Sequence, residues 1–545
     1  MKTAVEIIEI LLKNRQVVDR DDFLSPNYER VMASHDPFGL VDMDKAVERL
    51  VLARHQQHKI VIFGDYDADG VTATALLLDA LASFGFKRVD YFLPNRFTNG
   101  YGLTVKAIEQ ITKEQQPDLI VTVDCGSLNQ LEIERANQLG IDVIVTDHHN
   151  VAQIQPPAVA VVNPKRPENT YPNCYLSGVG TAFTLVRALQ TRLEGLAPGQ
   201  EKWLLDLVAI GTIADLMELK GENRALVKFG LVVLAKTRRL GLRQLLDQNK
   251  LEQLTAETIG FVIGPRINAS GRLESADFAL AVLTAQTLAE AHQRVEKLNY
   301  LNTKRRALQD KVYSEAFSQA VKSDDPVLVL IGDGWHEGVV GIVASRIQEE
   351  FQKPVFILSR QPEQIKGSAR SFGQFSVFEA IEACRDLLLT GGGHDAAGGL
   401  SLKPENFEAV RARINDFYRS LNLSDQQQFL EPKPEIKLDS LAVLTKDFYH
   451  QMHQLEPFGA GNPEPIFEVV NLTTVQVLFL GSDNQHLKIR LRDGDGRELE
   501  MISFNYNKDW KLRLDDRVKV IFTLSMNHWN GRETLQGRLL RIDKM

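Results

Sequence analysis

Three aspartates occupy alternate positions in the short segment GDYDADG, residues 64–70, which follows the apolar run KIVIF at 59–63. Carboxylates repel one another, so bringing Asp65, Asp67 and Asp69 together costs free energy unless cations or solvent relieve the repulsion. Taken alone, the segment is compatible with a solvated turn after a strand or with one wall of a metal site.

Further acidic and imidazole side chains follow other apolar runs of the chain. They are Asp124 in VDCGS, Asp147, His148 and His149 in TDHHN, and Asp215 in VAIGTIADL. Ligands of open α/β sheets bind beyond the carboxyl ends of the strands, so we expect these side chains on adjacent strand ends at one edge of a sheet. Each has an ordinary alternative on its own, since an aspartate after a strand is more often a helix N-cap and a histidine pair is usually a surface feature.

Such a set of side chains is typical of a metal centre. Oxygen ligands with one or two imidazoles suit Mn²⁺ or Mg²⁺ better than structural zinc. Two such ions, about 3.5–4 Å apart, activate a water and stabilise an in-line displacement at phosphorus. We find no serine or cysteine triad in the sequence that would offer a different route, and Cys125 beside Asp124 is expected to be a small buried residue.

The surrounding pattern predicts an α/β protein. Short β-rich apolar runs alternate with helical segments from 59 to about 163, which indicates a mostly parallel sheet. Residues 178–250 have a largely helical pattern, and one long helical stretch runs from about 275 to 322. A second α/β unit follows at 326–420, and alternating runs from 466 onward predict a small β-barrel of OB type.

The expected architecture is two α/β domains joined by a long helix around a cleft, with a C-terminal OB-type barrel. The predicted boundaries are an N-terminal extension at 1–45, a catalytic domain at 46–270, the connecting helix at 271–322, a second domain at 323–422, a polar linker at 423–436 and the barrel at 437–545.

Bulk composition is that of a globular protein with several domains. The chain has 545 residues, and 44% of them are hydrophobic and 25% charged. Its net charge of −8 argues weakly against nucleic acid, because a polymer can still be held by a local basic groove. The N-terminal stretch carries Glu6 and Glu9 and predicts an amphipathic surface helix, and three scattered cysteines predict a reducing compartment. We therefore expect a cytoplasmic protein without a membrane span.

The segments DYDADG, VDCGS, TDHH and IADL, in this order and spacing, resemble the DHH phosphoesterase superfamily. Nearly the whole chain is similar to one of its branches, the RecJ family of bacterial exonucleases. The motifs that carry this resemblance are LPNRFTNGYG (93–102), GPRINASGR (264–272), GWHEGVVGIVASR (334–346), GSARS (367–371), GGGHDAAGG (391–399) and LEPFGAGNPEP (455–465). The resemblance implies a 5′→3′ exonuclease specific for single-stranded DNA. It would release 5′-mononucleotides with two Mn²⁺ or Mg²⁺ ions, and act in DNA recombination and repair (end resection, mismatch repair and base-excision repair).

The resemblance also implies roles for individual residues. Ligands of one ion would be Asp69, Asp124, His148 and Asp215, and the other ion would be held by Asp67 and the bridging Asp124, with Asp65 as an additional candidate. Relatives often carry a histidine where Phe63 stands, which leaves the ligands of this ion less defined. His149 would contact the scissile phosphate, and Asp147 would orient an imidazole.

Several arginines in glycine-rich motifs are candidate phosphate contacts, because a guanidinium presents a fork of donors. The candidate substrate-binding residues are Arg96, Arg266, Arg272, Ser368, Arg370, Gly393 and His394. Arg96, Ser368 and Arg370 are expected to hold a terminal 5′-phosphate. For Gly393 and His394, a tight structural turn is the alternative.

The predicted barrel would add further contacts to a single strand of nucleic acid. Its candidate contacts are Arg490, Arg492, Phe504, Trp529 and Arg532, although aromatics in a small barrel are more often core residues. Two other functions stay open: a phosphoesterase for very short oligonucleotides or cyclic dinucleotides, and a non-catalytic DNA-binding replication factor. The resemblance further implies a monomer that binds single-stranded DNA, with a helicase and a single-strand-binding protein as partners.

Overall fold

The structure is a computed structural model of the chain. It describes residues 2–98, 100, 102–251, 253–421, 423, 432–481, 484–504, 506, 510–529 and 532–545, except for the side chains of 528 and 529. Most of the predicted linker at 423–436 therefore lies outside the described residues.

The first domain is built on a five-stranded parallel sheet in the order β2-β1-β3-β4-β5. Its strands are β1 (Ile60–Gly64), β2 (Val89–Phe92), β3 (Leu119–Val123), β4 (Asp142–Thr146) and β5 (Ala160–Val162). Every residue of β1 and β3 is buried, as expected for a parallel sheet with helices on both faces. The predicted parallel sheet is confirmed.

Helices cover both faces of this sheet. One face packs against α4 (Met43–Gln56), α5 (Ala68–Ser83) and α8 (Gly178–Gln190), and the other against α6 (Val105–Gln115) and α7 (Gln130–Gln138). A helical layer extends the first face, with α9 (Leu205–Ala214), α10 (Gly221–Leu234), α11 (Leu240–Gln248), α13 (Gly264–Leu273) and α14 (Asp277–Leu283). Residues 178–250 are therefore largely helical, as predicted.

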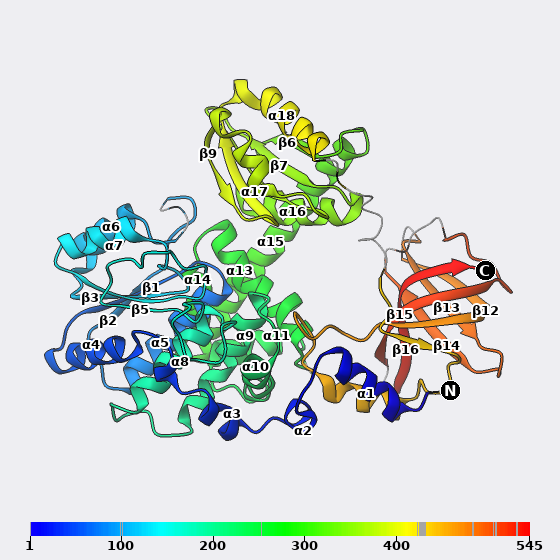
Figure 1. Cartoon of the computed structure of the whole chain (residues 1–545), viewed down its shortest axis with the longest axis horizontal. Coiled ribbons are helices and arrows are strands. Elements are labelled where there is room, and N and C mark those ends of the chain that lie inside the picture. The colour runs from blue at the N-terminus through cyan, green and yellow to red at the C-terminus, as the bar shows by residue number, and fades with distance from the viewer. Residues whose placement is uncertain are drawn as a thin grey trace.

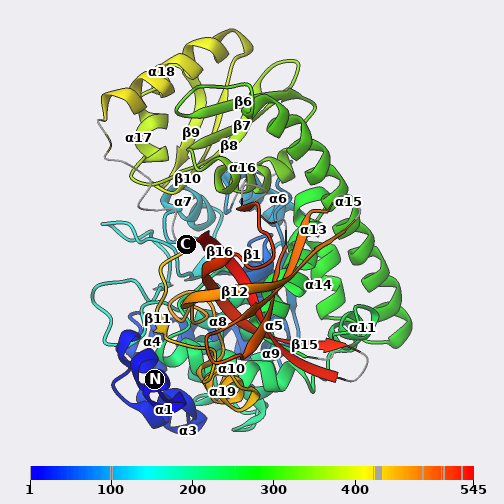
Figure 2. The ribbon, with the colours of Figure 1, turned by 90° about the vertical axis from the view of Figure 1, so that its right-hand side faces the viewer.

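The predicted single helix over about 275–322 is wrong at its N-terminal end. α14 ends at Leu283, and a separate helix α15 spans Leu288–Ala320. The break occurs because Thr287 caps α15, its side chain accepting a hydrogen bond from the Glu290 N–H at 3.2 Å. With 33 residues, α15 is about 50 Å long, and it connects the first domain to the second (Figures 1 and 2).

The second domain has a mixed sheet in the order β6-β7-β8-β10-β9, in which only β6 and β7 are parallel. Its strands are β6 (Leu328–Asp333), β7 (Val355–Arg360), β8 (Ile365–Arg370), β9 (Leu388–Gly393) and β10 (Ala397–Leu402). Helix α16 (Glu337–Phe351) packs between this sheet and α15, while α17 (Val377–Glu382) and α18 (Phe407–Ser420) belong to the core of the other face.

The C-terminal domain is a barrel in the order β11-β12-β13-β14-β16-β15, closed by the pairing of β12 with β15. The strands are β11 (Ile436–Leu438), β12 (Phe467–Leu480), β13 (His486–Arg492), β14 (Glu498–Ser503), β15 (Arg517–Trp529) and β16 (Arg532–Lys544), accompanied by α19 (Lys446–Met452). The predicted OB-type barrel is confirmed. The apolar face of α1 (Ala4–Asn14) packs into the core of this barrel, so the N-terminal helix and the C-terminal strand belong to the same domain (Figure 1).

Candidate two-metal site

The GDYDADG segment connects β1 to α5 through a very tight loop. Asp67 is the N-cap of α5, because its Oδ1 accepts hydrogen bonds from the N–H groups of Asp69 (2.9 Å) and Gly70 (3.1 Å). A Cβ on Gly70 would lie 2.6 Å from the backbone of Asp65, so only glycine fits this approach. Asp67 is thus a helix cap, and its other carboxylate oxygen takes no part in these two bonds.

Asp69 is held by the N-terminus of a second helix. Its two carboxylate oxygens accept hydrogen bonds from the N–H groups of Gly178 (2.6 Å) and Val179 (2.9 Å) in the first turn of α8. Helix N-termini favour negative charge, so this arrangement stabilises an ionised Asp69.

Asp124 follows β3 in a left-handed backbone conformation, with φ of 63°. This conformation is costly for a residue with a Cβ and is maintained here by the surrounding contacts, including a hydrogen bond from its N–H to the Thr146 carbonyl (2.9 Å). A Cβ on Gly178 would lie 2.5 Å from the Asp124 Cβ, so the absence of a side chain at Gly178 leaves room for the aspartate.

The TDHHN segment follows β4 and is organised by Asp147. This carboxylate accepts hydrogen bonds from the N–H groups of Ser127 (2.9 Å), His148 (2.7 Å) and His149 (3.1 Å), and its Oδ1 lies 2.8 Å from His149 Nδ1. Burial alone would raise its pKa, but the hydrogen bond from His149 and the other donors hold the pKa of Asp147 well below its usual range. Burial likewise opposes the protonation of His149, yet its bond to Asp147 raises the pKa of His149 to about 9.

Asp215 reaches the same point from a helix, which corrects the expectation that it follows a strand. It is the C-cap of α9, and Leu216 turns the chain with φ of 56°. The apolar run before Asp215 resembled a buried strand because α9 is apolar on all sides: all nine of its residues from Leu205 to Ile213 are buried.

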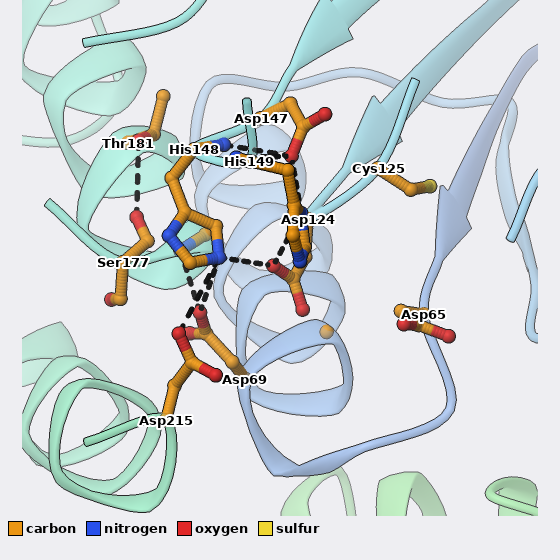
Figure 3. Close-up of polar contacts among 12 residues, drawn as sticks. Asp65, Asp69, Asp124, Cys125, Asp147, His148, His149, Ser177, Thr181 and Asp215 are labelled. Atoms are coloured by element: carbon orange, nitrogen blue, oxygen red, sulfur yellow. Dashed lines mark hydrogen bonds and ion pairs between the residues drawn. The ribbon is translucent and has the colours of Figure 1, made fainter. Parts of the chain in front are cut away.

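The carboxylates of Asp69, Asp124 and Asp215 converge on the imidazole of His148 (Figure 3). Its Nε2 atom lies 3.0 Å from Asp124 Oδ1, 3.4 Å from Asp215 Oδ2 and 3.8 Å from Asp69 Oδ2. His149 Nδ1 lies 4.0 Å from Asp124 Oδ1. Burial, followed by the charge of His149, lowers the pKa of His148 to about 3, so its imidazole is neutral and able to act as a ligand.

The carboxylates cannot all be ionised without a compensating charge. Burial, followed by the charge of Asp67, raises the pKa of both Asp65 and Asp69 to about 7. Burial and the charge of Asp69 raise the pKa of Asp215 to about 8, and the pKa of Asp124 well above its usual value. Cations are the simplest source of that charge.

The residues fit two divalent ions. Ligand atoms of Asp69, His148 and Asp215 lie within 4.8 Å of one another, as do those of Asp65, Asp67 and Asp124. Asp124 also belongs to a third such group with His148 and His149. Asp124 Oδ1 and His148 Nε2 are buried, and neither has a well-formed hydrogen bond within the described part of the chain. An ion between them would satisfy both atoms.

The repulsion among these buried carboxylates predicts that the stability of the metal-free protein depends on pH. Folding raises the pKa of Asp69 from its ordinary value of 3.8 to about 7, so unfolding releases protons between these two pH values. We therefore expect the melting temperature of the metal-free protein to fall as the pH rises from about 4 to about 7, and to fall less in Asp69→Asn. Adding Mn²⁺ at pH 8 should restore the stability of the wild type much more than that of the variant. Equal pH profiles of the two metal-free proteins would contradict this electrostatic account.

A pocket of about 210 Å³ lies between the first and second domains. Its lining residues are Arg96, Glu337, Val340, Lys366, Gly367, Ser368, Thr390, Leu400 and Ser401. Arg96 and Ser368, predicted to bind the same phosphate, thus share one pocket. Arg370 lies beside Ser368, since a Cβ on Gly341 would lie 3.3 Å from both Ser368 Oγ and Arg370 Nη2.

The other predicted substrate contacts have partners within the protein. Arg266 donates hydrogen bonds to Asn299 Oδ1 (2.9 Å), to the Val262 carbonyl (2.8 Å) and to Asn249. Arg272 donates to the Gly338 carbonyl at 3.3 Å.

Gly393 is the last residue of β9, and His394 begins the turn to β10, where its N–H donates to the Ala397 carbonyl (2.8 Å). The structure therefore shows the tight turn that was the alternative for this motif. Instead of these two residues, Thr390 and Ser401 of the same hairpin line the pocket, and the sequence carried no separate signal for them.

Of the residues predicted to contact a single strand from the barrel, the two arginines of β13 pair with glutamates of β14. Arg492 lies 2.6 Å from Glu498, and Arg490 lies 3.9 Å from Glu498 and Glu500. Phe504 is 56% exposed, and its ring is 5.3 Å from that of His486. Arg532 is exposed at the start of β16, and the side chain of Trp529 lies outside the described part of the structure.

Comparison with known proteins agrees with this arrangement. The DHH family N-terminal domain matches residues 59–212, the DHHA1 domain matches 324–420, and the RecJ OB domain matches 436–540. The single-stranded-DNA-specific exonuclease RecJ of Dickeya dadantii (strain 3937) is 35% identical over 517 residues, which cover 90% of this chain and 88% of that protein. This chain belongs to the RecJ family.

Other members of the RecJ family are also similar to this chain. RecJ of Bacillus subtilis (strain 168) is 38% identical over 92% of this chain, which spans only 63% of that relative. The crystal structure of RecJ from Thermus thermophilus in complex with Mn²⁺ matches with a TM-score of 0.85 and 32% identity, covering 99% of this chain and 76% of that one. A second structure of the same protein, in complex with Mg²⁺, matches with a TM-score of 0.78, 31% identity and coverage of 99% and 75%. The metals expected from the sequence are thus those found with this relative.

Helices long and apolar enough to cross a lipid bilayer are absent from the described residues.

Proposed function

We propose that this chain degrades single-stranded DNA from its 5′ end with two divalent ions and releases 5′-mononucleotides. The observation that carries the proposal is the convergence of five aspartates and two histidines beside a pocket that contains Arg96 and Ser368. Its relatives in the family are named as exonucleases specific for single-stranded DNA.

The proposed ligands divide into two overlapping sets. Asp69, His148, Asp215 and Asp124 would hold one Mn²⁺ or Mg²⁺ ion, and Asp65 and Asp67, again with Asp124, would hold the other. Bound ions of this kind activate a water and neutralise the charge that develops at phosphorus. The protein holds Asp69 through the N-terminus of α8 and Asp67 through that of α5, so both carboxylates are placed before substrate arrives.

His149 is proposed to contact the scissile phosphate. Asp147 holds its Nδ1, which leaves Nε2 as the free donor of a protonated ring. Its side chain is 41% exposed, whereas that of His148 is 4% exposed, so substrate has access to His149. A protonated donor fixed by a buried carboxylate stabilises a negatively charged phosphorane-like transition state.

The pocket between the domains is proposed to receive the terminal 5′-phosphate. Arg96 stacks on the ring of Tyr66, with its Cζ atom 4.4 Å from the centroid, and so links the pocket to the GDYDADG loop. Arg370 lacks a carboxylate partner among the described ion pairs, and its Nε donates to Ser345 Oγ at 3.0 Å. Its Nη1 donates to the Ala369 carbonyl at 2.8 Å, which leaves Nη2 as the donor proposed for a phosphate.

Arg370→Ala is expected to lower kcat/KM for 5′-phosphorylated oligonucleotides about tenfold to a hundredfold, and to affect 5′-hydroxyl oligonucleotides much less. Steady-state digestion of the two substrates measures this difference. Arg360→Ala is a suitable control, because Arg360 is an exposed arginine of the same sheet that pairs with Asp333. An equal loss on both substrates would remove the terminal-phosphate role.

A substrate series tests the proposed function. With Mn²⁺ or Mg²⁺, we expect digestion of single-stranded DNA, and little or none of blunt duplex, dinucleotides or cyclic dinucleotides. A preference for dinucleotides would favour the short-substrate phosphoesterase, and complete inactivity with intact strand binding would favour a non-catalytic DNA-binding factor. The barrel and the roughly 50 Å length of α15 support a polymer, because a dinucleotide needs neither.

We further propose that the chain acts as a cytoplasmic monomer in DNA recombination and repair, with a helicase and a single-strand-binding protein as partners. The support is family resemblance together with the scattered cysteines, of which Cys125 and Cys384 are buried. Sedimentation equilibrium tests the monomer, and pull-down with each purified partner tests the contacts.

A further inference from the structure

Helix α13, which contains the motif GPRINASGR, lies directly against the GDYDADG loop. Asn268 Oδ1 accepts a hydrogen bond from the Ala68 N–H at 2.8 Å. A Cβ on Gly271 would lie 2.6 Å from the Tyr66 carbonyl oxygen, so the helix backbone approaches the loop without a side chain between them. The distance between α13 and the proposed metal site is therefore set by backbone contact.

The C-terminal end of the same helix meets the second domain in the same way. Gly338 lies in the first turn of α16, and a Cβ there would lie 2.0 Å from the Arg272 carbonyl oxygen. Arg272 in turn donates from Nη1 to the Gly338 carbonyl at 3.3 Å. Rotation of a side chain cannot relieve the close contact between Gly338 and the Arg272 carbonyl, because both residues meet there through their backbones.

One turn further along, α16 contacts the residues proposed to hold the terminal phosphate. A Cβ on Gly341 would lie 3.3 Å from both Ser368 Oγ and Arg370 Nη2. A continuous series of close contacts thus runs from Tyr66, through α13 and α16, to Ser368 and Arg370. A glycine stands at each of its three joints.

We infer that Gly271 and Gly338 are positioning residues, which set the separation between the two-metal site and the 5′-phosphate pocket through α13. This inference rests on the proposed function. A methyl group at position 338 would lie 2.0 Å from the Arg272 carbonyl oxygen and would have to move out to an ordinary contact distance. Because both α13 and α16 are rigid helices, we expect this movement to displace the second domain by more than about 1 Å relative to the first. Misplacement by about 1 Å can lower a rate about 10²-fold, because reacting groups must be held in line.

Gly338→Ala tests the inference, with Gly260→Ala as its matched control. Gly260 is also helical and lies in the segment directly before α13, but a Cβ there would meet only Ile213 Cγ2, at 3.9 Å. We expect Gly338→Ala to bind Mn²⁺ within about twofold of the wild type and to lose about 10²-fold in kcat on 5′-phosphorylated single strands. The ratio of kcat/KM between 5′-phosphate and 5′-hydroxyl substrates should fall toward one, while Gly260→Ala keeps wild-type values.

Two results would overturn the inference: an unchanged 5′-phosphate preference in Gly338→Ala, or a loss of Mn²⁺ affinity that parallels the loss of activity. If Gly338→Ala lacks a cooperative thermal transition, Gly271→Ala serves instead, because its Cβ would lie 2.6 Å from the Tyr66 carbonyl oxygen and needs a smaller movement than the 2.0 Å approach at Gly338. It should show the same selective loss, about tenfold, and an unchanged preference would again overturn the inference. A wild type that digests no single strand, or shows no preference for a 5′-phosphate, would instead count against the proposed function.

Discussion

Asp124→Asn is expected to lower the rate of single-strand hydrolysis by at least about 10³-fold. Asp124 is the carboxylate common to two of the ligand groups, and its Oδ1 lies 3.0 Å from His148 Nε2. Asparagine keeps the shape and the left-handed backbone that this position requires, but it removes the negative charge and half of the ligand oxygens. Single-turnover digestion of 5′-labelled oligonucleotide with saturating Mn²⁺ gives the rate.

The variant should remain folded, since only a charge that burial disfavours is lost. Its metal-free melting temperature at pH 8 should equal or exceed that of the wild type. Asp90→Asn is the control, because Asp90 is an aspartate of β2 in the same sheet that pairs with Lys59 and is half exposed. If Asp124→Asn kept more than about a tenth of the wild-type rate, the carboxylate cluster would not be the site of hydrolysis.

His149→Ala is expected to lower kcat by about 10²–10³-fold while leaving Mn²⁺ affinity within about tenfold of the wild type. The reason is that His149 is proposed to be a charged donor toward the phosphate, whereas the buried His148 is proposed to be a metal ligand. Because the pKa of His149 is raised to about 9, its ring is protonated at neutral pH and loses its proton as the pH rises through 9. The wild-type rate should therefore decline above pH 9, and this decline should disappear in the variant.

Asp147→Asn separates this role from general damage. It removes the carboxylate that raises the pKa of His149, so the alkaline decline should move to lower pH instead of vanishing. His55→Ala, a change of an exposed histidine in α4, is the control for the loss of an imidazole. Identical pH profiles for the wild type and His149→Ala would exclude a protonated His149 from the reaction.

Local patterns predicted much of the fold and the proposed site. The apolar runs around 60–63, 119–123 and 143–146 predicted the parallel sheet, because strands buried on both faces are continuously apolar. Their carboxyl ends then placed Asp124 and the Asp147–His149 segment at one edge. The sequence did not show that Asp67 caps α5, but this cap uses one carboxylate oxygen and is compatible with Asp67 as a candidate ligand.

Other features depended on contacts distant in sequence. A fully buried helix and a buried strand share one apolar pattern, so the sequence did not show that Asp215 ends α9. The break before α15 depends on one threonine cap within an otherwise helical composition. The burial of α1 on the barrel joins residues more than 400 positions apart, which no local pattern reports. Similarly, GPRINASGR drew attention through its arginines, and the sequence did not show that Gly271 allows the close packing of α13 against the GDYDADG loop.

The count of Mn²⁺ ions bound to the chain, followed together with hydrolysis, tests the central claim most directly. Calorimetric titration of the wild type at pH 8 should give two Mn²⁺ per chain, and Asp124→Asn should bind fewer or far more weakly. In a parallel titration of 5′-labelled single-stranded DNA, release of labelled mononucleotide should rise only as the second ion binds. Full activity with one ion or none, or unchanged Mn²⁺ binding in Asp124→Asn, would contradict a two-metal centre built from these residues.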